Sequence, residues 1–398
     1  MSVLKVSLSS TVKPLQRESG QPLLSPQGPL AIVGGERVTD GIPEPIRPEP
    51  RSLFGPRGGC IAPDGSLWIC DTGHHRLLGW SHYLLAADHD AEWWVGQQTL
   101  FEEGRNARKS VGSNTLSVPT GITPYGQGLV VADAWNNRVL GWDTLPRSLN
   151  QPADWVLGQP DFESGMPNQG KSEASASSMH WPFGVLADGE TLWVADSKNR
   201  RVLRWNQRPT TPGAPADFVL GQPDFDTSDE NRGSTPDRAS MRWPHALTLW
   251  GGKLCLADAG NNRVLIWDGV PERSLEPCSW ILGQPDGQSV DHNQSSYWPR
   301  PDTLNMPYAL WGWKDWLLVA DTANSRLLGW HSQDLADGAP ARGLTGQADL
   351  FSKGDNRWGE VTPDSLCWPY GLGLYEQTVL VADSGNNRVH LWNLDEGL

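Results

Sequence analysis

The sequence predicts an all-β fold, a six-bladed β-propeller built of four-stranded antiparallel blades and closed into a ring by an N-terminal strand. Three observations predict it. A motif exemplified by residues 131–142 (VADAWNNRVLGW) occurs six times along the chain. A short apolar run ending in Gly-Gln follows each of the first five copies, whereas the sixth copy has none. Residues 31–35 (AIVGG) match the run that the sixth copy lacks.

The six copies share an aspartate, an arginine five positions later and a closing tryptophan. Successive aspartates lie 62 or 63 residues apart, and such regular self-similarity is typical of repeat architectures. A catalytic site needs one copy and not six, so we interpret the Asp and Arg as a structural pair meeting across a turn. The pairs are Asp71 and Arg76, Asp133 and Arg138, Asp196 and Arg201, Asp258 and Arg263, Asp321 and Arg326, and Asp383 and Arg388.

Each repeat resolves into four short strands. The first follows a proline, at Pro56, Pro119, Pro182, Pro244, Pro307 and Pro369. The second is the apolar run into the aspartate, the third begins at the arginine, and the fourth runs into Gly-Gln. The glycine of this fourth run recurs every 62 or 63 residues, and counting back 62 from Gly96 gives Gly34. The strand over residues 31–35 is therefore expected to complete the last blade and close the ring.

These landmarks divide the chain into two parts. Residues 1–30 carry Ser, Pro and Gln without a clear period, which predicts a loosely ordered arm. Residues 31–398 are predicted to form a single propeller domain. Its blades are expected at about 53–97, 116–159, 179–222, 241–284, 304–347, and 366–398 together with 31–35.

Composition narrows the classes of function. The formal net charge of −14 disfavours nucleic acid as a partner, because phosphate backbones are negative. Five cysteines without a CxxC pair argue against a disulfide framework and favour a reducing compartment. Neither a secretory leader nor an apolar run long enough to span a membrane is evident. We therefore expect a cytoplasmic, monomeric propeller that binds neither nucleic acid nor membrane.

The pattern Asp-x-x-Asn-x-Arg-[Val/Leu] resembles the NHL repeat, over residues 31–398. The first copy departs from it, with His74 at the usual asparagine. The resemblance implies a six-bladed propeller. It also implies a range of functions, since similar propellers serve as protein-binding modules, RNA-binding modules, extracellular sensors and a few metal-dependent lyases.

The linkers between blades and the Asp-to-Arg turns should emerge on one face of the ring, which we call the linker face. Trp135, Trp298 and Trp358 lie in these segments, and exposed aromatics favour partner binding. Trp250 and Trp313, beside Tyr125 and Tyr375, are expected to be exposed on the opposite hairpins. Three tryptophans that precede the strand-one proline, Trp181, Trp243 and Trp368, are expected to pack in the core or between blades.

Residues that follow the strand-one prolines should surround the mouth of the central channel. They are Arg57, Thr120, Phe183, His245, Tyr308 and Tyr370. This ring differs from blade to blade, which suits the binding of a small anion or a peptide carboxylate. The alternative is that its aromatic side chains simply plug the channel.

A metal site is the sharper hypothesis for the linker face. His74, His75, His180 and His245 should lie there, and imidazoles from separate blades could converge on zinc. No HExxH motif is present, however, and no carboxylate stands in the channel ring. No GxSxG, P-loop or GxGxxG motif occurs either. We therefore assign no metal, no cofactor and no catalytic residue.

The sequence favours a non-catalytic platform for protein interactions, such as an accessory component of a multi-subunit assembly. A protein is the expected partner, and a small molecule at the channel mouth is left open. The alternative is a metal-dependent lyase or hydrolase with its site at the channel mouth.

Overall fold

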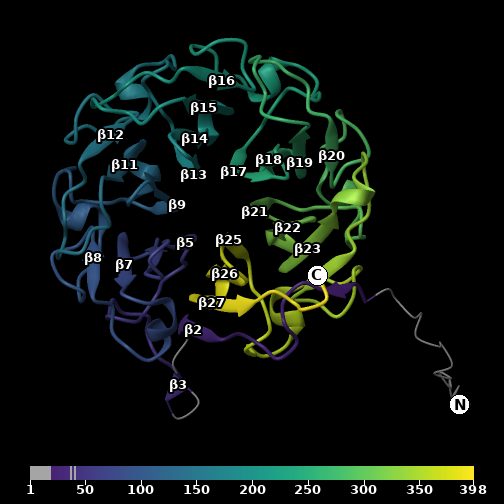
Figure 1. Cartoon of the computed structure of the whole chain (residues 1–398), viewed down its shortest axis with the longest axis horizontal. Coiled ribbons are helices and arrows are strands. Elements are labelled where there is room, and N and C mark those ends of the chain that lie inside the picture. The colour runs from purple at the N-terminus through teal and green to yellow at the C-terminus, as the bar shows by residue number, and fades with distance from the viewer. Residues whose placement is uncertain (1–18, 36–37, 40–41) are drawn as a thin grey trace, which may run out of the picture.

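The computed structural model describes residues 19–35, 38–39 and 42–398. Six four-stranded antiparallel units stand around a common centre, in chain order (Figure 1). The first strand of each blade contacts the first strands of both neighbouring blades, so these six strands surround the central channel. The predicted fold class, an all-β six-bladed propeller, is confirmed.

In each of the first three blades the strands follow one another from the central channel outward. Blade 1 holds β5 (Gly58–Ile61), β6 (Leu67–Asp71), β7 (Arg76–Trp80) and β8 (Trp93–Val95). Blade 2 holds β9 (Pro119–Tyr125), β10 (Gly128–Asp133), β11 (Arg138–Trp142) and β12 (Trp155–Leu157). Blade 3 holds β13 (Pro182–Asp188), β14 (Thr191–Asp196), β15 (Arg201–Trp205) and β16 (Phe218–Leu220).

The other three blades repeat this order. Blade 4 holds β17 (Pro244–Trp250), β18 (Lys253–Asp258), β19 (Arg263–Trp267) and β20 (Trp280–Leu282). Blade 5 holds β21 (Pro307–Trp313), β22 (Trp316–Asp321), β23 (Arg326–His331) and β24 (Gly343–Thr345). Blade 6 holds β25 (Pro369–Tyr375), β26 (Thr378–Asp383), β27 (Arg388–Asn393) and, as its outermost strand, β2 (Ala31–Gly34).

Strand β2 closes the ring, as the sequence predicts. It pairs antiparallel with β27, with Ala31 opposite Leu391 and Gly34 opposite Arg388. Figure 1 shows this purple strand beside the yellow end of the chain. Joining the two ends of the chain in one sheet leaves no blade incomplete.

The N-terminal segment differs from its prediction as a loosely ordered arm over residues 1–30. Strand β1 (Gln21–Pro22) pairs parallel with β24 and adds a fifth strand to blade 5. Leu23 is fully buried against Gly329 and Gly343, where a β-carbon would lie 2.4 and 2.2 Å from its side chain. The prediction is therefore wrong for residues 19–30, because two glycines leave a slot that an apolar side chain fills. Residues 1–18 lie outside the described part of the chain.

Short elements connect the blades. A two-stranded ribbon, β3 (Val38–Thr39) and β4 (Ile42–Pro43), precedes the first blade. Single 3₁₀ turns form the Asp-to-Arg connections of five blades: η3 (Ala134–Asn136), η5 (Ser197–Asn199), η7 (Ala259–Asn261), η9 (Thr322–Asn324) and η12 (Ser384–Asn386). The linkers contain η2 (Arg105–Arg108), η4 (Pro167–Gly170), η6 (Glu230–Gly233), η8 (His292–Ser295) and η11 (Asp355–Trp358). Two more, η1 (Tyr83–Ala87) and η10 (Ser332–Asp334), follow the third strands of blades 1 and 5.

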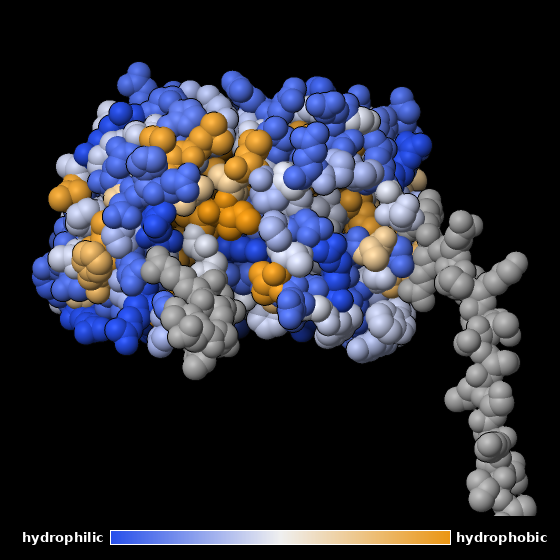
Figure 2. All heavy atoms as spheres, turned by 90° about the horizontal axis from the view of Figure 1, so that it is seen from below, coloured by the Kyte–Doolittle hydropathy of each residue, from blue (hydrophilic) through white to orange (hydrophobic). Residues whose placement is uncertain are grey.

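The hydrophobic core lies between neighbouring blades. The tryptophan at or one residue before the end of each third strand is buried in every blade, and its indole N–H donates to a backbone carbonyl, as from Trp80 to His89. Seen from the edge (Figure 2), the molecule is a thick disc whose surface on this side is largely hydrophilic, with hydrophobic side chains in separate groups. Within the described residues, no helix has the length and apolar character needed to cross a membrane.

Candidate functional site

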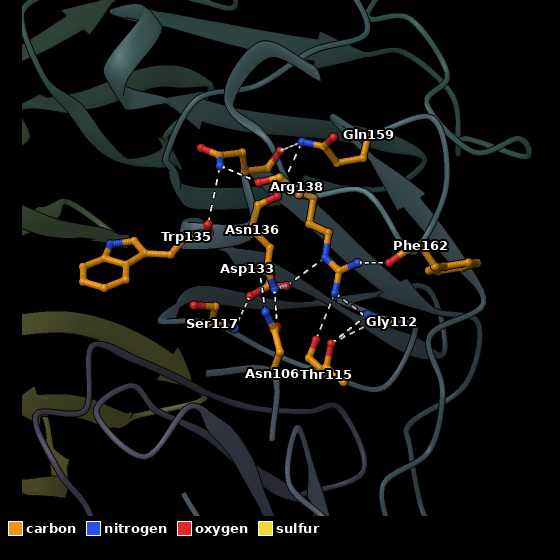
Figure 3. A network of polar contacts seen from close by, with 12 residues as sticks. Asn106, Gly112, Thr115, Ser117, Asp133, Trp135, Asn136, Arg138, Gln159 and Phe162 are labelled. Atoms are coloured by element: carbon orange, nitrogen blue, oxygen red, sulfur yellow. Dashed lines mark hydrogen bonds and ion pairs between the residues drawn. The ribbon is translucent and has the colours of Figure 1, made fainter. Parts of the chain in front are cut away.

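The Asp-to-Arg turn of blade 2 shows what the repeated polar residues do (Figure 3). The Asp133 carboxylate is buried and accepts from Arg138 Nε at 2.8 Å and from Asn136 Nδ2 at 2.7 Å. Its other oxygen accepts from the backbone N–H of Ser117, which precedes β9, at 2.6 Å. One carboxylate thus joins the second strand, the third strand and the start of the first.

The remaining donors of Arg138 fasten two linkers. Nη1 donates to the Phe162 carbonyl at 2.6 Å, in the linker that follows blade 2. Nη2 donates to the carbonyls of Gly112 and Thr115, both at 2.9 Å, in the linker that precedes it. The linkers and the turns therefore lie together on the linker face, as expected from the strand order.

The same ion pair recurs in all six blades, with Nε to Oδ2 distances between 2.7 and 3.0 Å. In five blades the turn asparagine also pairs with an asparagine of the preceding linker, as Asn136 does with Asn106. The other asparagine pairs are Asn168 and Asn199, Asn231 and Asn261, Asn293 and Asn324, and Asn356 and Asn386. A buried charge that is paired and fully hydrogen-bonded, repeated six times, is the chemistry of a scaffold.

The four histidines considered as zinc ligands have separate surroundings. His74 takes the place of the turn asparagine, and its Nδ1 lies 2.8 Å from Asp71. His75 Nδ1 accepts from the backbone N–H of Val118 at 3.0 Å, and burial together with Arg105 lowers the pKa of His75 to about 4. His180 packs edge-on against Trp181, whereas His245 stands in the channel. In the described part of the chain, no three His, Cys, Asp or Glu residues gather where they could hold a metal ion.

The six predicted channel residues do line one cavity. Four of them form a continuous stack: ring centroids are 4.4 Å apart between Phe183 and His245, 4.1 Å between His245 and Tyr308, and 4.5 Å between Tyr308 and Tyr370. The Arg57 guanidinium lies 4.7 Å above the Tyr370 ring and extends the stack by a cation–π contact. Thr120 donates its hydroxyl to the Phe183 carbonyl at 2.9 Å.

This stack fills the channel mouth. The cavity left is about 70 Å³, which is small beside the roughly 300 Å³ or more of a typical small-molecule site. Burial and the charge of Arg57 lower the pKa of His245 to about 3, so its imidazole stays neutral at physiological pH. Burial and Tyr370 raise the pKa of Tyr308. The arrangement has the chemistry of an aromatic plug with a neutral imidazole inside it.

The three tryptophans predicted to bind a partner are exposed, by 40% for Trp135, 52% for Trp298 and 68% for Trp358. The Trp135 ring packs under Arg105, whose guanidinium lies 3.9 Å from the ring centroid. Trp298 and Trp358 lie on the two linkers that flank blade 5, and Lys353 of the second linker reaches the first. Lys353 Nζ lies 3.7 Å from the Tyr297 ring and 5.9 Å from the Trp298 ring, and Trp358 packs on Gly354, next to Lys353.

We call Tyr297, Trp298, Lys353 and Trp358 the aromatic patch. It spans the linkers before and after blade 5, and Tyr297, which the sequence reasoning did not single out, is 65% exposed.

Two other expectations about aromatic residues are wrong. Trp250 and Tyr125, expected to be exposed, are buried, because each donates a hydrogen bond to the next blade's hairpin, at Lys314 and Glu190. Trp368, expected in the core, is 51% exposed. Trp181, at the equivalent position of blade 3, has the same left-handed backbone (φ of 52° against 51°) but is only partly exposed, so the backbone conformation alone does not set the exposure of Trp368.

The sequence reasoning also missed a group of cations where blade 3 meets blade 4. Lys198, Arg200 and Arg242 line a separate cavity of about 350 Å³. Aligning the six repeats would have found them, because no other blade has lysine or arginine at these three positions.

No protein-family model matches the sequence, and no curated protein does either. Among solved structures, the chain is similar to a streptogramin B lyase, with 12% identity, 88% of this chain and 97% of that chain covered, and a TM-score of 0.46. It is also similar to the WD40 β-propeller domain of Doa1, with 8% identity, 93% and 98% coverage, and a TM-score of 0.44. A nidogen/laminin complex gives 14% identity, 79% and 95% coverage, and a TM-score of 0.43. At such values the assignment rests on the chain's own strands, which make it a six-bladed β-propeller.

Proposed function

We propose that this protein is a non-catalytic platform that binds a protein partner through the aromatic patch. The observation that carries the proposal is the exposure of Tyr297, Trp298 and Trp358 on two neighbouring linkers. Exposed tyrosine and tryptophan are enriched at the centres of protein interfaces, where they bury large apolar areas at little cost in side-chain entropy.

Arg326 hydrogen-bonds to both linkers that carry the patch. Arg326 Nη1 donates to the Leu350 carbonyl at 2.6 Å in the linker after blade 5, and its Nη2 donates to the Thr303 carbonyl in the linker before it. A binding surface that is already ordered loses less conformational entropy when a partner docks. The repeated Asp and Arg scaffold thus supports the proposed use of the patch.

The proposal includes membership of the NHL-type propellers and a cytoplasmic location. The repeat pattern supports the first. The five cysteines support the second, since all are free thiols and four are buried. Burial raises the pKa of the Cys278 thiol to about 11, so this thiol is largely protonated and poorly reactive at neutral pH.

The alternative, a metal-dependent lyase or hydrolase at the channel mouth, has less support. The stacked rings leave a small cavity there, and the channel ring contributes no carboxylate. This alternative is tested by measuring the metal content of the wild type and of a His245→Ala variant, both purified without a chelator. About one metal ion per chain that is lost in the variant would favour it over the platform.

The platform is tested by a Trp298→Ala, Trp358→Ala double variant. The wild type and the variant are each used to capture partners from an extract of the native cells, and the captured proteins are compared by mass spectrometry. We expect one protein in stoichiometric amount with the wild type and at least a tenfold loss with the double variant. An unchanged melting temperature is expected, because both side chains are exposed.

A matched control removes an exposed apolar side chain from the opposite face. Leu149 is 60% exposed in the connection between β11 and β12, so Leu149→Ala should retain the partner. Equal capture by all three proteins would contradict the role assigned to the aromatic patch.

A further inference from the structure

Five of the six seams between neighbouring blades share one hydrogen bond. The residue just before the Arg of one blade has a left-handed backbone, and its side chain accepts from the N–H of the residue before the next blade's proline. The bonds join His75 to Val118 (3.0 Å), Asn137 to Trp181 (3.0 Å), Asn262 to Met306 (2.9 Å), Ser325 to Trp368 (3.2 Å) and Asn387 to Gly55 (2.9 Å). Each of these side chains offers a hydrogen-bond acceptor.

The seam between blades 3 and 4 breaks this rule. Arg200 occupies the left-handed position, with φ of 52°, and a guanidinium has no acceptor to offer. The N–H of Trp243 bonds instead to Asp258, within blade 4, at 3.2 Å. Trp243 also lacks the positive φ that the equivalent residues of the other five seams share. At this seam the local backbone therefore differs from that of the other five, and the inter-blade bond is missing.

The same seam gathers three cations. Lys198 and Arg200 come from the turn of blade 3, and Arg242 comes from the segment before β17. At the position of Lys198 the other blades have Gly73, Trp135, Gly260, Ala323 and Gly385. At that of Arg242 they have Phe54, Ser117, His180, Asn305 and Cys367. The other blades are built without cations at these positions, so the repeated scaffold does not require them.

The positive charge at this seam is only partly neutralised. Arg242 pairs with Glu230 at 2.9 Å, and both side chains are about half exposed. Arg200 Nη1 donates only to backbone carbonyls, of Lys198 and Ser228. Within the described residues, neither Lys198 nor Arg200 has a carboxylate at ion-pair distance. The pocket therefore carries a positive excess in a chain whose net charge is −14.

The positive charges of Lys198 and Arg200 also act on the neighbouring His180. Burial is the main cause that lowers the pKa of His180, and the charges of Lys198 and Arg200 lower it further, against the opposite effect of Asp196. The positive potential of the lysine and arginine side chains that line the pocket favours the binding of an anionic ligand.

We propose that this pocket binds a small ligand bearing a doubly charged oxyanion, either a phosphate monoester or a dicarboxylate. Guanidinium and ammonium groups together match such groups in charge and hydrogen-bond geometry. The cavity of about 350 Å³ is large enough for a small molecule, and Trp243 offers a partly buried aromatic wall beside the cations. The inference goes beyond the proposed platform, and its site includes no residue of the aromatic patch.

The experiment is calorimetric titration of the full chain, at low and at physiological salt, with three probes: inorganic phosphate, phenyl phosphate and malonate. Arg200→Asn is the key variant, because asparagine restores the residue type of three other seams and should fold at least as well as arginine. Lys198→Gln is the second variant. Lys314→Gln, which removes one positive charge from a hairpin on the opposite face, is the matched control.

We expect one site per chain, with at least tenfold weaker binding in Arg200→Asn and Lys198→Gln and less than a twofold change in Lys314→Gln. Tighter binding of phenyl phosphate than of malonate would identify a phosphate ligand, and the reverse order a dicarboxylate. No binding of any probe at millimolar concentration, or equal binding by all four proteins, would overturn the proposal.

Discussion

The Asp-to-Arg turns and the channel ring are both contributed once by each blade, yet they behave in opposite ways. The turn of every blade holds the same buried ion pair, with Nε to Oδ2 distances within 2.7 to 3.0 Å. The channel ring instead brings different side chains to equivalent positions, and these stack into a plug. Positions that carry the same residue in every blade hold the blades together. Positions whose residue differs from blade to blade are not fixed by this shared scaffold.

The largest effect should come from removing a uniform residue. Asp196→Ala would leave Arg201 buried without its carboxylate and would orphan the donors of Asn199 and His180. Breaking a buried pair in this way costs about 3–5 kcal/mol. Denaturant unfolding of the variant should show this loss, while Asp188→Ala, at an exposed hairpin, should show little. An unchanged unfolding midpoint for Asp196→Ala would refute the scaffold role.

One position in the third strand carries leucine in five blades and histidine in blade 6. His390 is buried where the other five blades have leucine, and neither ring nitrogen has a hydrogen-bond partner in the described structure. Burial, and then Arg388, lower the pKa of His390 from 6.5 to about 3. The unfolded chain therefore takes up this proton first as the pH falls, so the folded state loses stability between about pH 6.5 and pH 3.

By pH 4 the loss from His390 should reach about 3 kcal/mol, at about 1.4 kcal/mol per pH unit. His390→Leu should remove that part of the acid sensitivity, whereas His89→Gln, at an exposed histidine, should not. Denaturant unfolding at pH 7 and at pH 4 measures both. Parallel pH dependence in wild type and His390→Leu would show that the buried imidazole is not the cause.

A smaller effect is expected in the channel ring. Arg57→Gln removes the cation–π contact with Tyr370 and should cost about 1 kcal/mol or less. The same change at Arg138, which loses an ion pair and bonds to both linkers, should cost several times more. If thermal unfolding showed the same loss of stability for Arg57→Gln and Arg138→Gln, the Asp-to-Arg pairs would not be more important for folding than the channel ring.

The sequence alone predicts most of the fold. The repeat length places each strand, and the missing fourth strand of the last blade identifies β2 as the closing strand. The fifth strand of blade 5 could not be predicted in this way, because it has no counterpart in other blades and depends on space left by Gly329 and Gly343.

The sequence predicts the candidate sites less completely. The channel residues follow from strand order, but only the structure shows their rings stacked into a plug. The sequence does not predict the exposure of Trp250 and Trp368, because a side chain's exposure depends on what neighbouring parts of the fold pack against it. The cations of the blade 3–4 seam were visible in the aligned repeats, but the missing inter-blade bond was not.

In our account, residues shared by the repeats maintain the fold, whereas the departures at the blade 3–4 seam create a binding site. Arg200→Asn tests both parts at once, by thermal unfolding and phosphate titration of one variant. We expect a small rise in melting temperature, on the order of 1 °C, because an inter-blade hydrogen bond is restored, together with the loss of phosphate binding. A lower melting temperature with phosphate binding intact would contradict the claim.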